Sequence, residues 1–333
     1  MDKEKFFSLM KGVLHDGPYH EYYEQMLHTI WRLSHENPPL DDIKLINTSL
    51  KELRYTSKVL SHYKGRKKIT VFGSARTKQS SPVFKLAVHF GQKISEMGYM
   101  VITGGGPGIM EAANLGAGRE NSFGFNIRLP FEQSANPVVD DDFKLINFKY
   151  FFTRKLAFVK EADALALFPG GFGTHDEAYE VLTLTQTGKS APMPIVMIDH
   201  HHGKYWKSWK KFVESHLLKA KLVSKEDFNL FKIVSSVEEA CAYIHHFYSN
   251  YHSQRYIKDV LVVRMHRDIP EKHLKLMNRK FEDIIVKGHI EKTGSLDVER
   301  EDSDNTHLKR IKFNFNRKNY GRLYQLIGEI NKF

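Results

Sequence analysis

The stretch YMVITGGGPGIM, residues 99–110, decides the fold. Residues 99–103 form a short apolar run that predicts a buried strand. Four glycines follow within residues 104–108 and lead into a segment of helical spacing that reaches about Ala117. A strand, a glycine turn and a helix in direct succession are typical of one β-α unit in a parallel sheet.

The same alternation continues on both sides of this stretch. Short apolar strands alternating with helices indicate right-handed β-α-β units, whose parallel sheet is covered by helices on both faces. We therefore expect an α/β, Rossmann-like domain over residues 65–250. The further strands predicted here lie at 69–72, 122–128, 143–148, 164–168 and 194–198, and the helices at 82–97, 151–161, 174–187 and 237–247.

The two flanking segments have different patterns. Apolar residues at helical spacing predict a helical arm of two or three helices over residues 1–64. Residues 251–333 predict a small α+β domain with its own core. Its strands are expected at 259–264 and 308–315, its helices at 270–283 and 320–330, and a solvated acidic loop at 299–304.

Composition removes several classes of protein. The chain has 333 residues and a single cysteine, Cys241, so it forms no internal disulfide and no cysteine-based zinc site. No apolar core of a signal peptide follows the first residues, and no apolar run approaches the roughly 18 residues of a membrane helix. We expect a cytoplasmic protein without membrane contact.

The distribution of charge narrows the choice of ligand. The chain has 50 Lys+Arg and 39 Asp+Glu, a net charge of +11. Residues 1–64 are neutral, with nine basic and nine acidic residues, and the excess lies in the rest of the chain. Bases and acids are interleaved in 251–333, and no nucleic-acid-binding motif is present. This pattern argues against nucleic acid and favours small phosphorylated ligands.

The glycine turn at 104–108 predicts a phosphate site. Glycines allow a close approach of the backbone, and the following helix presents free N–H groups to an anion. The turn lacks the dinucleotide fingerprint, because Ile109 stands where the third glycine is required. A tight turn without a ligand is the alternative. The substrate-binding residues expected here are Gly104, Gly105, Gly106, Gly108 and Met110.

Residues 169–177 form a second predicted strand–turn–helix unit, again with glycines between the strand and the helix. Glu177 lies one turn into the helix that follows, and Glu180 shares its face. A carboxylate beside two anion sites is suited to ribose hydroxyls, a water molecule or a developing cation. A helix-capping carboxylate is the alternative. The substrate-binding residues expected here are Gly170, Gly171, Gly173, Thr174 and Glu180.

Arg154 and Lys155 begin a predicted helix, where their charges oppose the helix dipole. This placement favours an anionic partner, and a surface pair with Asp140–Asp142 is the alternative. Ser74 and Arg76, after the first strand, add a hydroxyl and a charge near the same edge.

Three motifs occur in order along the chain: TGGGPGIMEAA from Thr103, FTRK from Phe152 and PGGFGTHDE from Pro169. Together they resemble the LOG ("lonely guy") family over about residues 67–200. That family was formerly labelled lysine decarboxylase. The resemblance is to its longer bacterial members. Glu111 stands where the family has a glycine, which affects the expected contacts to the base.

The resemblance implies a phosphoribohydrolase that cuts the N-glycosidic bond of a nucleoside 5′-monophosphate, such as AMP or a cytokinin riboside monophosphate. The products are a free base and ribose 5-phosphate. Arg154 and Glu177 would be the catalytic residues, with Lys155 and Ser74 in substrate binding and no metal or other cofactor. The resemblance also implies a homodimer or higher homo-oligomer, and a charged nucleotide as a possible regulator.

Other readings have specific features against them. Decarboxylation of lysine commonly uses a lysine Schiff base with pyridoxal phosphate, and Lys155 alone lies near the site. A non-catalytic carrier of a nucleotide or cofactor with the same fold has no use for the Arg154–Glu177 pair. The run His200–His202 is expected to lie in a solvated loop. We expect His175 to be a pocket residue and Trp206 and Trp209 to be packing residues.

Overall fold

The computed structural model describes residues 5, 8, 17, 19–127, 135–296 and 305–333. These form two compact units, residues 1–54 and 55–333. Residue 128, at the end of a predicted strand, and the predicted acidic loop 299–304 lie outside the described residues. Within the described ranges, no helix combines the length and the apolar character needed to cross a membrane.

The first unit contains helix α2 (His20–Glu36) and most of α3 (Leu40–Ser61), and the last residues of α3 belong to the second unit. Helix α2 buries none of its side chains. It exposes Tyr22, Met26 and Ile30 on its apolar stripe. The predicted boundaries of the arm and of the small domain, and the predicted oligomer, stay predictions.

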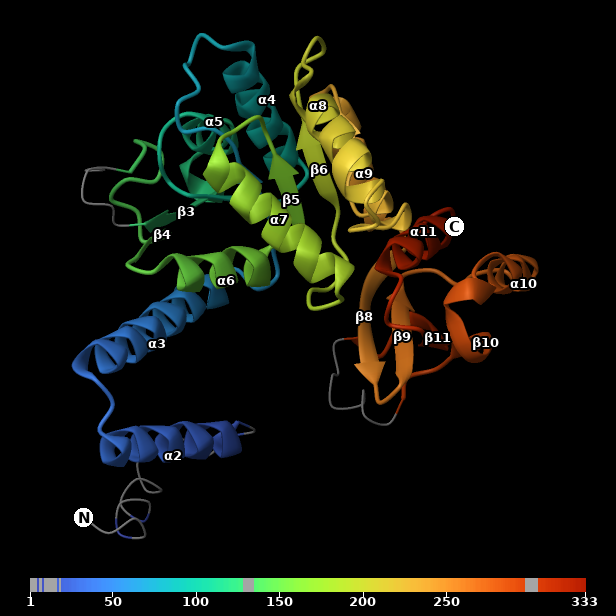
Figure 1. Ribbon diagram of the computed structural model, residues 1–333, viewed down its shortest axis with the longest axis horizontal. Coiled ribbons are helices and arrows are strands. Elements are labelled where there is room, and N and C mark those ends of the chain that lie inside the picture. The colour runs from blue at the N-terminus through green and yellow to red at the C-terminus, as the bar shows by residue number, and fades with distance from the viewer. Residues whose placement is uncertain (1–4, 6–7, 9–16, 18, 128–134, 297–304) are drawn as a thin grey trace. The chain divides into compact units, whose positions relative to one another are not determined.

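The second unit is built on a seven-stranded parallel sheet in the order β4-β3-β2-β1-β5-β6-β7 (Figure 1). Helices cover both faces, so the predicted α/β Rossmann-like fold is confirmed. The strands are β1 (Lys68–Phe72), β2 (Met100–Thr103), β3 (Ser122–Ile127), β4 (Leu145–Phe148), β5 (Ala164–Leu167), β6 (Ile195–Ile198) and β7 (Lys232–Val234).

The strand order reverses between β1 and β5. The chain lays down β2, β3 and β4 on one side of β1, then returns and places β5 on the other side. Thr70 of β1 accordingly pairs with Ile102 of β2 and with Leu165 of β5. Ligands of open parallel sheets bind outside the carboxyl ends of the strands at such a reversal. The fold therefore places the turns after β1 and β5 side by side.

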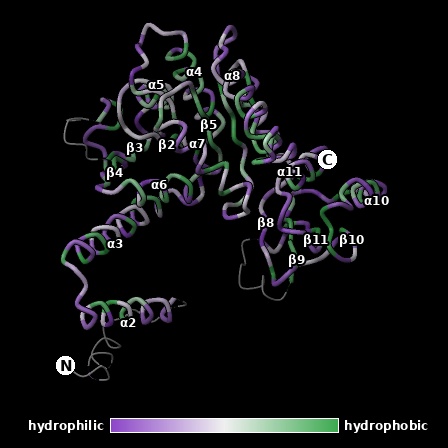
Figure 2. The backbone as a smooth tube through the Cα atoms, in the orientation of Figure 1, coloured by the Kyte–Doolittle hydropathy of each residue, from purple (hydrophilic) through white to green (hydrophobic). Residues whose placement is uncertain are grey.

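Each face of the sheet has its own apolar core, and in Figure 2 the hydrophobic colour runs through the strands around β5. Trp206 is fully buried and Trp209 is 9% exposed, so the packing role predicted for both is confirmed. One face packs on α4 (Pro82–Glu96), α5 (Ile109–Ala117) and α9 (Val237–Phe247), the other on α6 (Phe151–Glu161), α7 (Phe172–Gln186) and α8 (Tyr205–Phe212).

The C-terminal segment forms the predicted α+β structure around a separate core. Its sheet is antiparallel in the order β10-β11-β9-β8. The sequence did not indicate β7, β8 or β10: β7 has three residues, β8 is largely polar, and β10 contains Gly288 and register shifts. The elements are β8 (Tyr251–Ile257), β9 (Val260–Met265), α10 (Glu271–Lys280), β10 (Ile285–Thr293), β11 (Lys309–Phe315) and α11 (Tyr320–Ile330).

Tyr324 of helix α11 bonds to the segment that leads into strand β6 of the large sheet. The hydroxyl of Tyr324 donates to the carbonyl of Met193 at 2.8 Å and accepts from the N–H of Met193 at 3.0 Å. Met193 immediately precedes Pro194, whose carbonyl pairs with β5. Burial raises the pKa of Tyr324, so the hydroxyl keeps the proton that it donates.

Replacing Tyr324 with phenylalanine is expected to lower the free energy of unfolding by about 1–3 kcal/mol, because it leaves two buried backbone groups of Met193 without partners. Urea denaturation followed by circular dichroism measures the change. The same substitution at exposed Tyr22 is the control and is expected to have no effect. An unchanged midpoint for Y324F would contradict the proposed link.

Candidate active site

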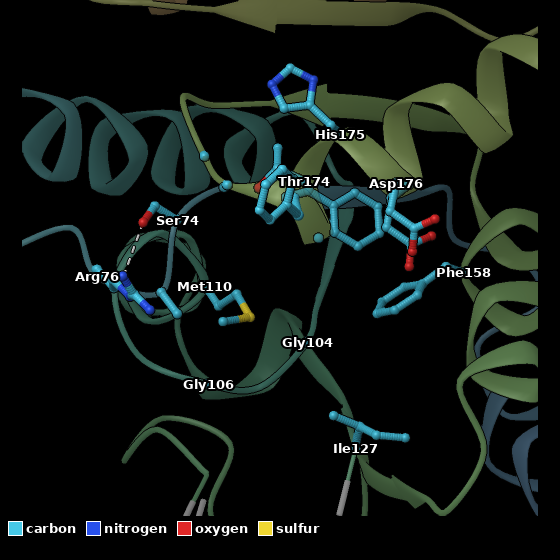
Figure 3. Close-up of a pocket in the computed structure, with 18 of the residues that line it drawn as sticks. Ser74, Arg76, Gly104, Gly106, Met110, Ile127, Phe158, Thr174, His175 and Asp176 are labelled. Atoms are coloured by element: carbon cyan, nitrogen blue, oxygen red, sulfur yellow. Dashed lines mark hydrogen bonds between the residues drawn. The ribbon is translucent and has the colours of Figure 1, made fainter. Parts of the chain in front are cut away.

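A cavity of about 730 Å³ opens at the carboxyl ends of β1, β2, β3 and β5 (Figure 3). The turns after β1, β2 and β5 form its floor, and the first turns of α6 and α7 form one side. In Figure 3 the backbone N–H of Arg76 donates to Ser74 Oγ, at 3.1 Å, on the side opposite Phe158. The cavity thus lies where the strand order reverses, as the rule for parallel sheets requires.

The turn after β2 leads into the start of α5, and its Gly104 and Gly106 line the cavity. Gly108 has φ +68°, and a Cβ there would lie 2.3 Å from the carbonyl oxygen of Ser74. Two residues hydrogen-bond to the backbone of this turn. Thr103 Oγ1 accepts from the N–H of Gly105 at 3.0 Å, and the N–H of Asn136 donates to the carbonyl of Gly105 at 2.7 Å. The glycine turn is therefore fixed in place against the turn after β1.

The turn after β5 is fixed from α8. A Cβ on Gly170 would lie 2.0 Å from Thr174 Oγ1, so the turn lies directly on the first residues of α7. The Tyr205 hydroxyl donates to the carbonyl of Gly170, and His175 Nε2 lies 2.7 Å from the same hydroxyl. Because that hydroxyl has one hydrogen, we assign the hydrogen of the second pair to Nε2 of His175. Burial lowers the pKa of His175, which favours the neutral ring.

A buried carboxylate and a guanidinium lie at the α6–α7 side of the cavity. Glu177 is 4% exposed, and its Oε1 lies 3.3 Å from Lys155 Nζ. Its Oε2 is buried and has no hydrogen-bond partner among the residues that the structure describes. The Arg154 guanidinium lies 4.9 Å from the ring centre of Phe151 and 5.6 Å from that of Phe158. A carboxylate and a guanidinium thus lie on one side of the cavity.

The electrostatics of Glu177 suit it for proton transfer. Burial raises the pKa of its carboxyl above the usual range, and Glu180 acts in the same direction. Lys155 and Arg154 act to lower this pKa and only partly offset the burial. A carboxyl whose pKa is moved toward neutrality is a better acid or base catalyst at physiological pH than an ordinary glutamate.

The cavity brings together most of the residues that the sequence singled out. Gly105 and Gly108 belong to the first turn but lie outside the cavity lining. Lys155 and Glu180 also lie outside it and pair with each other at 2.9 Å. The roles of all these residues stay predictions. The predicted residues that line the cavity are Ser74, Arg76, Gly104, Gly106, Met110, Arg154, Gly170, Gly171, Gly173, Thr174, His175 and Glu177.

Several lining residues carried little or no signal in the sequence. Tyr205 lies 30 positions from its partner His175, and only the fold brings them together. Asn126 is partly exposed in β3, whose other residues are buried. Phe172 is 96% exposed at the cavity rim, and its position between two glycines is the signal that marks it, since such a residue packs poorly into a core.

The histidine run follows β6 and makes a surface turn. His201 and His202 are exposed. The buried Asp199 carboxylate accepts from the N–H groups of His200 and Tyr205, at 2.9 and 3.0 Å. Among the described residues, no group of three or more His, Cys, Asp or Glu side chains is arranged to hold a metal ion.

Comparison with known proteins identifies the segment that carries this site. Residues 101–244 match the family described as possible lysine decarboxylase. The family match contains both glycine turns, Arg154 and Glu177, and leaves out Ser74 and Arg76. It covers less than half of the chain, and it agrees with the resemblance of this segment to the family formerly labelled lysine decarboxylase. No curated protein matches the chain.

Solved structures similar to the chain cover about half of it. A molybdenum cofactor binding protein from the phototrophic bacterium Rippkaea orientalis is 24% identical, with a TM-score of 0.38, over 53% of this chain and 93% of that one. A molybdenum cofactor carrier protein from Chlamydomonas reinhardtii is 20% identical, with a TM-score of 0.37, over 53% and 94%. A structural genomics target is 24% identical, with a TM-score of 0.37, over 53% and 96%.

Proposed function

We propose that the cavity hydrolyses the N-glycosidic bond of a nucleoside 5′-monophosphate and releases the free base and ribose 5-phosphate. The observation that carries this proposal is the buried Glu177 carboxylate, with one oxygen unpartnered among the described residues, beside two glycine turns at helix N-termini. Such turns bind phosphate through backbone N–H groups. The glycine turns then bind the 5′-phosphate at one end of the ribose, and the Glu177 carboxylate lies at the other end, near C1′.

The chemistry follows from the charges. Breaking the bond from C1′ to the base leaves its electron pair on the base nitrogen and positive charge on the sugar ring. The Glu177 carboxylate stabilises that cation and takes a proton from the attacking water, whose oxygen forms the new bond to C1′. The departing base gains the proton that balances the reaction. Arg154 contributes positive charge for the phosphate or the departing base.

The family's label, lysine decarboxylase, has less support at this site. A lysine that forms a Schiff base must present a neutral amine to its partner. None of the described residues that line the cavity is a lysine. Burial acts to lower the pKa of Lys155, but Asp176 and Glu180 outweigh it and raise the pKa, which keeps the amine charged. We therefore favour hydrolysis of a nucleotide.

The test is an assay of base release from a panel of nucleoside monophosphates, AMP included, followed by chromatography. We expect release of base and ribose 5-phosphate in equal amounts from at least one member. Glu177→Gln, purified in parallel, reveals any contaminating nucleosidase. Binding of a monophosphate without release of base would overturn the hydrolase and favour the alternative, a non-catalytic carrier.

A further inference from the structure

Lys155 contacts a cluster of three carboxylates on the neighbouring helix. Its ammonium lies 2.8 Å from an Asp176 oxygen, 3.3 Å from a Glu177 oxygen and 2.9 Å from a Glu180 oxygen. The Lys155 side chain is 16% exposed, whereas that of Asp176 is 59% exposed. We name Asp176, Glu177 and Glu180 the carboxylate cluster.

The side chain of Lys155 points in a different direction from that of Arg154. Consecutive residues of an α-helix point about 100° apart, and Arg154 lines the cavity while Lys155 does not. An ammonium has three N–H donors, and three carboxylates already lie within ion-pair distance of this one. Its charge is therefore committed to α7 and not to a phosphate in the cavity.

The contact leaves the two oxygens of Glu177 in different situations. Oε1 faces Lys155, while Oε2 is buried without a hydrogen-bond partner among the described residues. Glu177 lines the cavity and is itself 4% exposed. A cation on one oxygen fixes the side chain and leaves the other oxygen for the ligand.

We propose that Lys155 is a positioning residue that holds Glu177 ionised with Oε2 available to the substrate, and that it is not a phosphate ligand. The expected effect of Lys155 on turnover rests on the proposed hydrolysis. The effect of Lys155 on the charge and orientation of Glu177 does not depend on that proposal.

The charges around Glu177 give the sign of the expected effect. Arg154 and Lys155 face it from α6, and Asp176 and Glu180 share α7 with it. Burial raises the pKa of Glu177, and Lys155 is the strongest group acting against that rise. Removing the ammonium disfavours the ionised carboxylate, so the pKa of Glu177 must increase further.

The experiment compares Lys155→Met, Lys155→Arg and the control Lys160→Met, an exposed lysine on the same helix that pairs with Glu161. The pKa of Glu177 is measured by NMR of ¹³C-labelled glutamate side chains, with Glu177→Gln used to assign the signal. Affinity for ribose 5-phosphate is measured by calorimetry, and kcat, KM and the pH profile of kcat/KM are measured with AMP. Thermal melting confirms that each variant is folded.

For K155M we expect the pKa of Glu177 to rise by about 1–3 units and kcat to fall by about 100-fold. The affinity for ribose 5-phosphate is expected to stay unchanged. The acid limb of the pH profile moves to higher pH, because the ionised carboxylate is the active form. K155R restores part of kcat, and K160M matches the wild type.

An unchanged pKa of Glu177 in folded K155M would overturn the proposal, and so would a loss of affinity for ribose 5-phosphate with normal kcat, the result expected of a phosphate ligand. If the wild type releases no base from any monophosphate, the proposed hydrolysis fails. The NMR result still decides the role of Lys155 in that case.

Discussion

Glu177→Gln is expected to lower kcat for base release by about 10²- to 10⁴-fold while leaving the binding of AMP nearly intact. The amide has the shape of the carboxyl but neither its negative charge nor its ability to take a proton. In the proposed complex the phosphate binds to backbone N–H groups of the two glycine turns, which this change does not touch. Single-turnover kinetics and calorimetry with AMP measure the two effects separately.

The matched control is Glu96→Gln, an exposed carboxylate at the end of α4. It is expected to behave as the wild type. If E177Q keeps full kcat, the buried carboxylate takes no part in bond cleavage. If E177Q instead loses AMP binding at unchanged kcat, Glu177 contributes to ground-state recognition and not to the transition state.

Gly108→Ala is expected to destabilise the protein by about 2–6 kcal/mol. The backbone there, with φ +68° and ψ −127°, lies in a region that a side chain strains. The new Cβ would also meet backbone atoms of Ser74 and Ala75 at 2.3 and 2.6 Å. Separating the turns after β1 and β2 disturbs the floor of the cavity as well as the packing. Guanidinium denaturation measures the loss of stability.

Gly171→Ala provides the comparison, because this glycine immediately precedes α7 in extended conformation and a Cβ there meets nothing within 4 Å. Its effect on the denaturation midpoint is expected to be small. Equal losses for the two variants would mean that the close approach of Gly108 to Ser74 is not what makes the turn sensitive.

The sequence was sufficient for the architecture of the sheet because its central strands are apolar on both faces. Runs such as residues 164–168, bounded by a glycine turn and followed by a helix, are typical of strands buried on both faces of a parallel sheet. The glycines that follow β2 and β5 mark the carboxyl ends, where the cavity lies. Strand β8, with intermediate burial along most of its length, has no such pattern, and its place depends on pairing with β9.

The candidate site was predictable where one segment contains both the turn and the reactive group, as in residues 169–177. It was not predictable where groups meet through the fold. The contact of Tyr205 with Gly170 joins two segments 35 positions apart. Lys155 looks like an anion ligand in the sequence, because the three carboxylates that surround it lie on another helix.

The Tyr324–Met193 pair bears on how the chain is made by the ribosome. These partners are separated by 131 positions along the chain. Synthesis proceeds from the N-terminus, so α7 and the segment before β6 emerge long before the helix that packs on them. The surface of α7 and of the segment before β6 therefore stays uncovered until α11 has left the ribosomal exit tunnel. A stop codon late in the message would therefore affect folding far from the missing residues.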